Sequence, residues 1–318
     1  MIRFLALAAS FLTSVAAAQT YPDRPVRILV GYPPGGGTDL VARIVAQPLG
    51  ERWKQPVIVE NRPGAAAIIA TEAVVKSKPD GYVLLMAYAT ELAVNPATFK
   101  KLPYDPVRDL TPIARLGSAP LVMAVHPSVP AQTLAELVAL AKSKPGALSY
   151  SSSGTGSVHQ FAGELFKLRT GADIVHVPYK GSGPATADAV SGQVQVTFAS
   201  VASVLRFVQS GRLRALAVTS AERSPQLAEV PTMKEAGVAD VQLTSWYGLL
   251  APAGTPAEVV KKIAADLAAV MANPALGNGF AAQGLDLVRD SPAQFASFIR
   301  EEAEKYARIA KAARIEQE

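Results

Sequence analysis

Two short glycine-rich turns constrain this chain most, because each follows an apolar run and leads into an amphipathic stretch. The first spans Tyr32 to Asp39 and contains Gly35-Gly36-Gly37. The second spans Ser151 to His159 and contains Gly154-Thr155-Gly156. A glycine turn that opens a helix directs free backbone N–H groups and the positive end of the helix dipole at one point. Two such turns on separate lobes would grip a small anion, whereas either turn alone is equally well explained as a tight connection.

Neither turn carries a nucleotide-phosphate motif. No lysine follows Gly36 or Gly37, as a phosphate loop requires. The dinucleotide fingerprint needs a third small residue where Leu40 and His159 stand. Gly37 is expected to approach an anion closely and to need a φ that only glycine tolerates.

Strand-like and helix-like segments alternate along the chain, which predicts parallel or mixed sheets covered on both faces. The length of 318 residues favours two lobes over one sheet. The runs Leu121 to His126 and Trp246 to Ala251 are the expected crossings between lobes. The other expected strands are Val26 to Val30, Val57 to Val59, Val83 to Met86, Leu148 to Tyr150, Ile174 to Val177, Val194 to Phe198 and Ala215 to Thr219.

Three segments carry the signature of a capped helix start. Thr133 to Glu136 predicts a capping box, and Thr255 to Glu258 and Ser291 to Gln294 repeat it with proline at the first helical position. The last of these opens a helix with one apolar stripe at helical spacing. That stripe consists of Phe295, Phe298, Ile299, Ala303, Tyr306 and Ile309.

The first 18 residues have the layout of a secretory signal peptide: Arg3, an apolar stretch from Phe4 to Val15, and the small-residue site Ala16 to Ala18. The apolar stretch is too short for a membrane span, which takes about 20 residues. The chain has no cysteine, so the fold is expected to rest on its apolar core. The net charge of +5 is scattered and aromatic residues make up only 7%, which argues against nucleic-acid binding.

Catalytic signals are sparse. Of the three histidines, His126 and His176 are expected to be structural, and only His159 lies at a glycine-rich turn. No pair of histidines has metal-ligand spacing, and the Gly-x-Ser-x-Gly elbow is absent. Ser157 at a helix start is better explained as a cap than as a nucleophile. We therefore expect no catalytic residue, no metal and no cofactor.

A series of motifs resembles the Bordetella-uptake-type family, the extracytoplasmic solute receptors of tripartite tricarboxylate transporters. The resemblance spans essentially the whole mature chain and is specific in combination. The motifs that carry it are Pro33 to Asp39, Val59 to Ala65, Lys78 to Tyr82, Leu102 to Pro106, Ser152 to Ser157, His176 to Gly181, Leu213 to Thr219, Val230 to Thr232 and Trp246 to Gly248.

The resemblance implies an α/β type II periplasmic-binding fold, in which two lobes with mixed sheets are joined by two crossing strands. The expected boundaries are 1–18 for the signal peptide, 19–122 plus 247–318 for lobe I, and 123–246 for lobe II. The family holds a carboxylate between the lobes. The ligand-binding positions that this implies are Tyr32, Gly36, Gly37, Thr38, Asp39, Tyr88 and Thr90 in lobe I, and Ser153, Thr155, Gly156, Ser157, His159, Tyr179, Gly181, Ser182 and Ser200 in lobe II.

Two departures from the family pattern bear on the ligand. Ala199 stands where many relatives have an acidic residue, which argues against an amino-acid ammonium group. Tyr88 and Glu91 lie in a turn that is rich in Gly, Ser and Thr in many relatives. Tyr88 is expected to pack or to stack on a ring, and Glu91 to be solvated or to face a cationic group.

The sequence thus predicts a monomeric periplasmic binding protein that captures a small carboxylate and delivers it to the membrane subunits of a tripartite transporter. Two alternatives stay open at this point. One is a secreted hydrolase that uses Ser157 or Ser153 with His159. The other is a ligand-sensing receptor for a signalling system.

Overall fold

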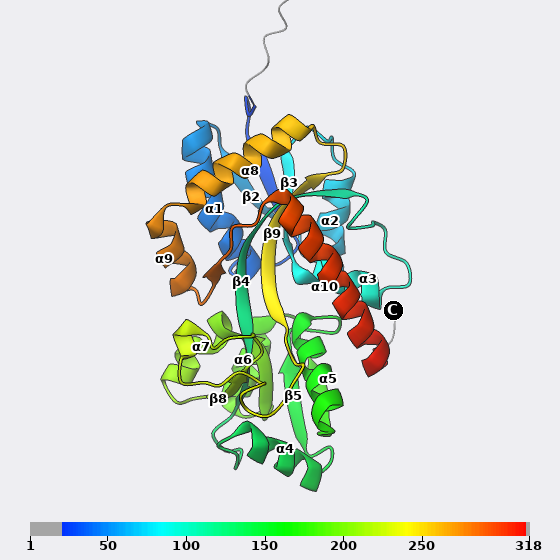
Figure 1. Cartoon of the computed structure of the whole chain (residues 1–318), viewed down its shortest axis with the longest axis vertical. Coiled ribbons are helices and arrows are strands. Elements are labelled where there is room, and N and C mark those ends of the chain that lie inside the picture. Colours follow the sequence, from blue (N-terminus) through cyan, green and yellow to red (C-terminus); the bar gives the residue numbers. More distant parts are fainter. Residues whose placement is uncertain (1–20, 316–318) are drawn as a thin grey trace, which may run out of the picture.

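Residues 21–315 are described by the structure, a computed structural model; the predicted signal peptide lies outside these residues. Two α/β lobes lie one above the other, with two long strands running between them (Figure 1). The strands are β1 (Val26–Val30), β2 (Val57–Asn61), β3 (Val83–Tyr88), β4 (Leu110–Val125), β5 (Leu148–Ser152), β6 (Ile174–Pro178), β7 (Val196–Ser200), β8 (Arg214–Val218), β9 (Thr244–Pro252) and β10 (Asp286–Leu287).

The helices cover the sheets from both sides, and no helix within residues 21–315 combines the length and the apolar character that a membrane crossing needs. Short 3-10 turns occur at Ala65–Ala67 and Pro225–Leu227, and a π-helical turn at Thr90–Val94. The helices are α1 (Gly37–Trp53), α2 (Ile68–Val75), α3 (Asn95–Thr98), α4 (Leu134–Ser143), α5 (Val158–Thr170), α6 (Ser182–Ser191), α7 (Val201–Gln209), α8 (Ala257–Met271), α9 (Pro274–Ala282) and α10 (Pro292–Ala313).

Strand β4 joins the lobes, because it changes partners along its length. Its first part pairs antiparallel with β9 up to Pro120, and from Leu121 onward it pairs with β7 and β8. The sequence predicted only the second part of this strand. Pro112, Gly117 and Pro120 interrupt the apolar pattern of the first part, and the pairing with β9 shifts register at two places there. The predicted lobe boundaries, between residues 122 and 123 and between residues 246 and 247, stay a prediction.

The directions of the strands bring their carboxyl ends to the junction between the lobes. Strands β3 and β4 are both antiparallel to β9, and β1 is parallel to β3, so β1, β3 and β4 run toward lobe II. Strand β7 is antiparallel to β4, and β5 and β6 run with it, so these three run toward lobe I. The carboxyl ends of the parallel strands in both lobes therefore face the junction, where α/β sheets bind their ligands.

The helix starts confirm the predicted caps only in part. Ser291 forms the full capping box with Gln294. Thr133 caps α4 through the N–H of Glu136, but the Glu136 carboxylate accepts from Gln132 rather than from Thr133. The box at Thr255 is wrong: its hydroxyl donates to the Pro252 carbonyl at 2.8 Å and leaves α8 without a side-chain cap.

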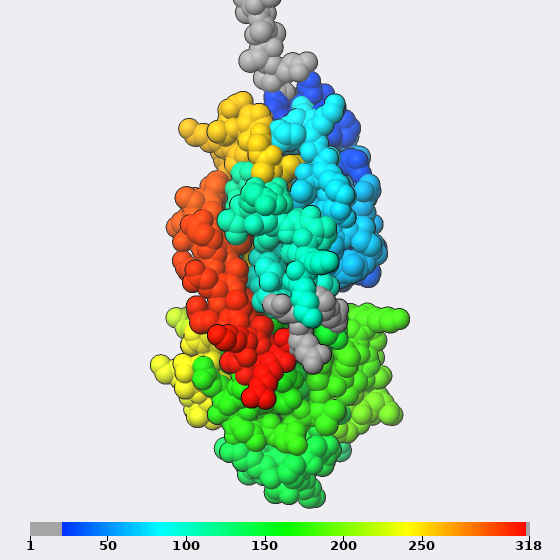
Figure 2. Space-filling view, turned by 90° about the vertical axis from the view of Figure 1, so that its right-hand side faces the viewer, coloured from blue at the N-terminus to red at the C-terminus, as the bar shows by residue number. Residues whose placement is uncertain are grey.

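Helix α10 reaches from lobe I onto lobe II. Its stripe is buried at Phe295, Ile299, Tyr306 and Ile309, as the spacing predicts. The Tyr306 ring packs edge-on against Phe161 of α5, with the ring centroids 5.2 Å apart. Figure 2 shows the C-terminal end of α10, in red, lying on the green surface of lobe II. This helix thus contributes to the contact between the lobes.

Candidate functional site

The predicted site residues all lie at or shortly after the carboxyl ends of strands that face the junction. The first glycine-rich turn follows β1, and Tyr88 and Thr90 lie at the end of β3. The second glycine-rich turn follows β5, Tyr179 to Ser182 follow β6, and Ser200 ends β7. The lobes approach closely here, since a Cβ at Gly156 would lie 3.7 Å from the Thr98 hydroxyl of lobe I. Five segments that are distant in sequence therefore share one region.

Four helices begin at this junction: α1, α5, α6 and α7. Three of their N-cap residues, Gly36, Gly181 and Ser200, make no side-chain hydrogen bond to the first turn. The fourth, Ser157, accepts from the Gln160 N–H at 3.2 Å, so it is the cap that the sequence predicted. First-turn N–H groups without a cap, together with the helix dipoles, make this region favourable for an anion.

Asp39 holds the first turn in shape. Its carboxylate accepts hydrogen bonds from the Gly35 N–H at 2.8 Å, from Arg43 at 3.0 Å and from the Asn61 amide at 2.9 Å. Burial opposes ionisation of this carboxyl, but these hydrogen bonds outweigh it and lower the pKa of Asp39. Gly36 is exposed and Thr38 is buried in the same turn. The structure thus gives the Asp39 side chain partners within the protein on both of its oxygens.

His159 lies in the first turn of α5 and is only 4% exposed. Its Nδ1 is hydrogen-bonded to the Ser153 hydroxyl at 2.6 Å. Its Nε2 is buried and has no hydrogen-bond partner among the described residues. Burial lowers the pKa of His159 to about 4, so the imidazole is neutral at pH 7.

The same geometry bears on the hydrolase alternative. A catalytic triad needs a carboxylate that orients the histidine from the side opposite the serine. No acid occupies that place at His159 among residues 21–315, since its second nitrogen has no partner there. The Ser153–His159 bond instead links the second glycine-rich turn to the start of α5.

The β6 and β7 ends complete the lobe II side. The Gly181 N–H donates to the Ser153 carbonyl at 3.0 Å, which ties the β6 turn to the second glycine-rich turn. The Tyr179 hydroxyl donates to Asp188 at 2.7 Å, and Ser200 shares a hydrogen bond with Ser203 at 2.7 Å. Ser182 is half-buried at the start of α6, and Thr155 is exposed.

Three tyrosines form the lobe I wall of the junction. The Tyr32 and Tyr88 rings lie edge to face with centroids 5.9 Å apart, and Tyr88 packs on Tyr247 at 5.3 Å. The Tyr88 hydroxyl is hydrogen-bonded to Ser245 at 2.6 Å. Sequence reasoning predicted Tyr32 and Tyr88 but missed Tyr247 and Ser245. Tyr247 stands inside the family motif Trp246 to Gly248, which was the one available signal for it.

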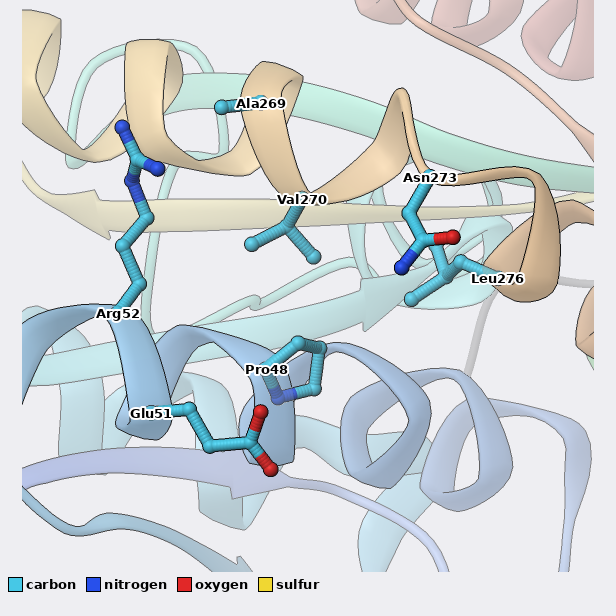
Figure 3. Close-up of a pocket in the computed structure, with 7 residues that line it drawn as sticks. All are labelled: Pro48, Glu51, Arg52, Ala269, Val270, Asn273 and Leu276. Carbon is cyan, nitrogen blue, oxygen red and sulfur yellow. The ribbon is translucent and has the colours of Figure 1, made fainter.

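A separate groove of about 360 Å³ lies on the outer face of lobe I, between α1, α8 and α9 (Figure 3). Arg52 is the one cationic residue that lines this groove, and it forms an ion pair with Asp266 of α8 at 2.7 Å. None of the predicted site residues lines it. The lining residues are Pro48, Glu51, Arg52, Ala269, Val270, Asn273 and Leu276.

Comparison with known proteins agrees with this arrangement. The family model described as "Tripartite tricarboxylate transporter family receptor" matches residues 41–315. The chain belongs to this family. It is also 37% identical to BugT of Bordetella pertussis over 315 residues, which covers 97% of each protein.

Solved structures extend the likeness to the whole fold. One is an R. palustris protein solved with adipate, 33% identical with a TM-score of 0.88, covering 94% of this chain and 100% of that one. Another is MatC from Rhodopseudomonas palustris with bound malate, 29% identical with a TM-score of 0.83, covering 91% and 99%. The predicted two-lobed fold and the predicted family are confirmed. The chain is a solute-binding receptor of the tripartite tricarboxylate transporter family.

Proposed function

We propose that this receptor captures a small carboxylate at the junction of its lobes. The observation that carries the proposal is the convergence of four helix N-termini there, three of them without a side-chain cap. An anion can take the place of the missing caps, and the aligned dipoles favour its charge. The adipate and malate bound by two relatives are both carboxylates, which supports the same chemistry.

Each side of the junction has a distinct role in the proposed site. The first turn offers backbone N–H groups from Gly36 to Thr38, together with the Tyr32 hydroxyl. The lobe II side offers hydroxyls of Ser153, Thr155 and Ser182, the uncapped first-turn N–H groups of α6, and the free Nε2 of His159. The N–H groups of Gly156 and Gly181 are themselves engaged by Gln160 and Ser153, so these two glycines shape the turns. Asp39 acts on the ligand through the shape of the turn, since its oxygens are engaged by Gly35, Arg43 and Asn61. Thr90, Ser157, Tyr179 and Ser200 are the remaining positions proposed to surround the ligand.

The receptor acts by binding alone, as a monomer, after export directed by residues 1–18. It then delivers its ligand to the membrane subunits of a tripartite transporter. Membership in a family of receptors supports this role over an enzymatic one. The histidine with no orienting acid supports it as well.

Thermal unfolding with and without dicarboxylates tests the proposal. Adipate or malate at about 100 times its Kd should raise the free energy of unfolding by about 2.7 kcal/mol. Adipamide, which keeps the chain length of adipate without its charges, is the matched control and should have no effect. Equal stabilisation by adipate and adipamide, or no stabilisation by any mono- or dicarboxylate, would contradict the proposal that the junction binds an anion.

A further inference from the structure

Glu91 follows β3 at the junction and has no part in the proposed function. Its side chain is fully buried, at 0% exposure, in the π-helical turn Thr90–Val94 that follows β3. A buried carboxyl is costly unless it is paired or neutral. Single π-turns inside helices occur frequently at functional sites. The sequence left Glu91 as either a solvated residue or a contact for a cation, and the first of these is wrong.

Both oxygens of the Glu91 carboxyl group form hydrogen bonds with tyrosines of the lobe I wall. Its Oε2 lies 2.8 Å from the Tyr32 hydroxyl, and its Oε1 accepts from the Tyr88 N–H at 3.1 Å. The Tyr104 hydroxyl donates to the Glu91 backbone carbonyl at 2.9 Å, which anchors the turn from behind. Both carboxyl oxygens of the fully buried Glu91 are therefore engaged within the protein, one of them by the Tyr32 hydroxyl.

No cation pairs with Glu91 among the described residues. Helix α10 packs on the same turn, but its Lys305 pairs with Glu302, which also accepts from the Trp246 indole at 2.9 Å. Asp39 and Arg43 in the neighbouring turn pair with each other. The ionisable groups brought toward Glu91 by the elements packed around it are Tyr32, Tyr88, Tyr104, Tyr306 and the Glu302–Lys305 pair.

Without a cation, burial favours the neutral acid. Desolvation raises the pKa of Glu91 to about 8, against the hydrogen bonds that favour its charged form. Burial and the neighbouring Glu91 raise the pKa of Tyr32 well above its ordinary value, so the tyrosine keeps its proton. One hydrogen bond of 2.8 Å therefore joins two groups that both carry a proton at pH 7, and only one of the two protons can lie between them.

We infer that Glu91 is a positioning residue: when the ligand binds, its carboxyl is protonated and donates a hydrogen bond to the Tyr32 oxygen, which leaves the Tyr32 O–H free to donate to the ligand carboxylate. The proton comes from solvent and no covalent bond other than O–H changes. If Glu91 is ionised instead, the Tyr32 O–H points back to it and a negative charge stands behind the ligand. Capture of an anion then takes up a proton.

This inference rests on the proposed function, because it needs a carboxylate at Tyr32. It also excludes the remaining expectation from the sequence, that Glu91 faces a cationic group. Such a group would have to reach a fully buried carboxyl whose oxygens are engaged by Tyr32 and Tyr88. Of this pair Tyr32 is half-buried, whereas Glu91 is fully buried, so the inference assigns the contact with the ligand to Tyr32.

Calorimetric titration with adipate, which is fully ionised above pH 7, tests the inference. Binding is measured at pH 7, 8 and 9 in two buffers with different ionisation enthalpies. Proton uptake should grow from a small fraction at pH 7 toward one proton per adipate at pH 9. The Kd should rise by up to tenfold for each pH unit above about 8. Malate serves as a second probe.

Three variants separate this role from mere packing. Glu91→Gln keeps the size and is neutral, so its adipate affinity should stay within threefold of that of the parent at pH 7 and lose its pH dependence. Tyr32→Phe removes the donor to the ligand and should bind adipate at least fivefold more weakly at pH 7. Glu229→Gln, an exposed carboxyl, should behave like the parent.

A ligand-free measurement keeps the test decisive if a variant folds poorly. The parent should lose stability relative to Glu91→Gln as pH rises from 5 to 8, because a folded-state pKa raised above the unfolded value loses its contribution in that interval. Adipate binding without proton uptake, or a pH-independent stability difference, overturns the inference alone. Failure of every carboxylate to bind overturns the proposed function and this inference with it.

Discussion

The hydroxyl of Tyr247 occupies the space into which a Cβ at Gly37 would project. The Tyr247 ring carbon that bears this hydroxyl would lie only 3.0 Å from that Cβ. Gly37 is the first residue of α1, and its φ is not in the left-handed region. The expectation that Gly37 needs a φ that only glycine tolerates is therefore wrong. Glycine is required because strand β9 places a tyrosine against the start of the helix.

We expect Gly37→Val to weaken adipate binding by more than tenfold, or about 1.4 kcal/mol, because the new side chain displaces either Tyr247 or the first turn. Titration calorimetry on variants that melt close to the parent measures this. Gly37→Ala combined with Tyr247→Phe should bind better than Gly37→Ala alone, since the hydroxyl is removed. Lys261→Ala, on an exposed face of α8, is the control. Normal binding by a well-folded Gly37→Val would place the ligand elsewhere.

His159 should make the protein less stable in mild acid. Its pKa falls from 6.5 in the unfolded chain to about 4 in the folded one, through burial. A depressed pKa contributes stability above pH 6.5 that is lost as pH falls toward 4. The loss should be on the order of 3 kcal/mol, measured by urea unfolding at a series of pH values. His159→Asn should flatten this part of the profile, and identical slopes for both proteins would contradict the prediction.

Replacing Ala65 by glycine should stabilise the protein. Ala65, Ala66 and Ala67 adopt left-handed φ values of 47°, 50° and 68° in succession. Each costs an alanine about 1–2 kcal/mol, which glycine does not pay because it has no Cβ. The freer unfolded chain of glycine offsets part of this gain. Ala65 is exposed, so no packing is lost. A gain of about 0.5–1 kcal/mol is expected in denaturant unfolding.

The control for this change is an alanine with ordinary helical geometry. Ala265→Gly, at an exposed position of α8, should instead destabilise by about 1 kcal/mol. Equal effects of the two substitutions would show that the left-handed alanines carry no strain.

Gly284 should control how closely the lobes approach. A Cβ there would lie 2.9 Å from the Ala202 backbone of α7 in lobe II. We expect Gly284→Ala to hold the lobes apart, giving a larger radius of gyration by small-angle scattering in the presence of adipate, and weaker adipate binding. Gly211→Ala is a matched control. The φ of Gly211 is 69°, nearly the same as the 68° of Gly284, but a Cβ at Gly211 would meet no atom within 4 Å. If both variants give the same radius of gyration, the close approach of Gly284 to Ala202 does not set the distance between the lobes.

The strand ends that form the site were predictable because their signals are local. A glycine turn between an apolar run and an amphipathic stretch identifies a strand-to-helix connection by itself, and the expected strands at Val26–Val30 and Leu148 onward are confirmed. The cap at Ser157 and the capping box at Ser291 are local as well, since each joins a side chain to a backbone group three residues away.

The sequence by itself thus determined the alternation of elements, the family, and the segments that end at the junction. Tertiary structure alone decided the partners that meet there, because these are separated by long stretches of chain. Tyr88 meets Ser245, and Glu91 meets Tyr32, only after β3 pairs with β9 and lies beside β1. Burial of Glu91 is likewise a property of the whole lobe, since desolvation depends on every element packed around the carboxyl rather than on its neighbours in sequence.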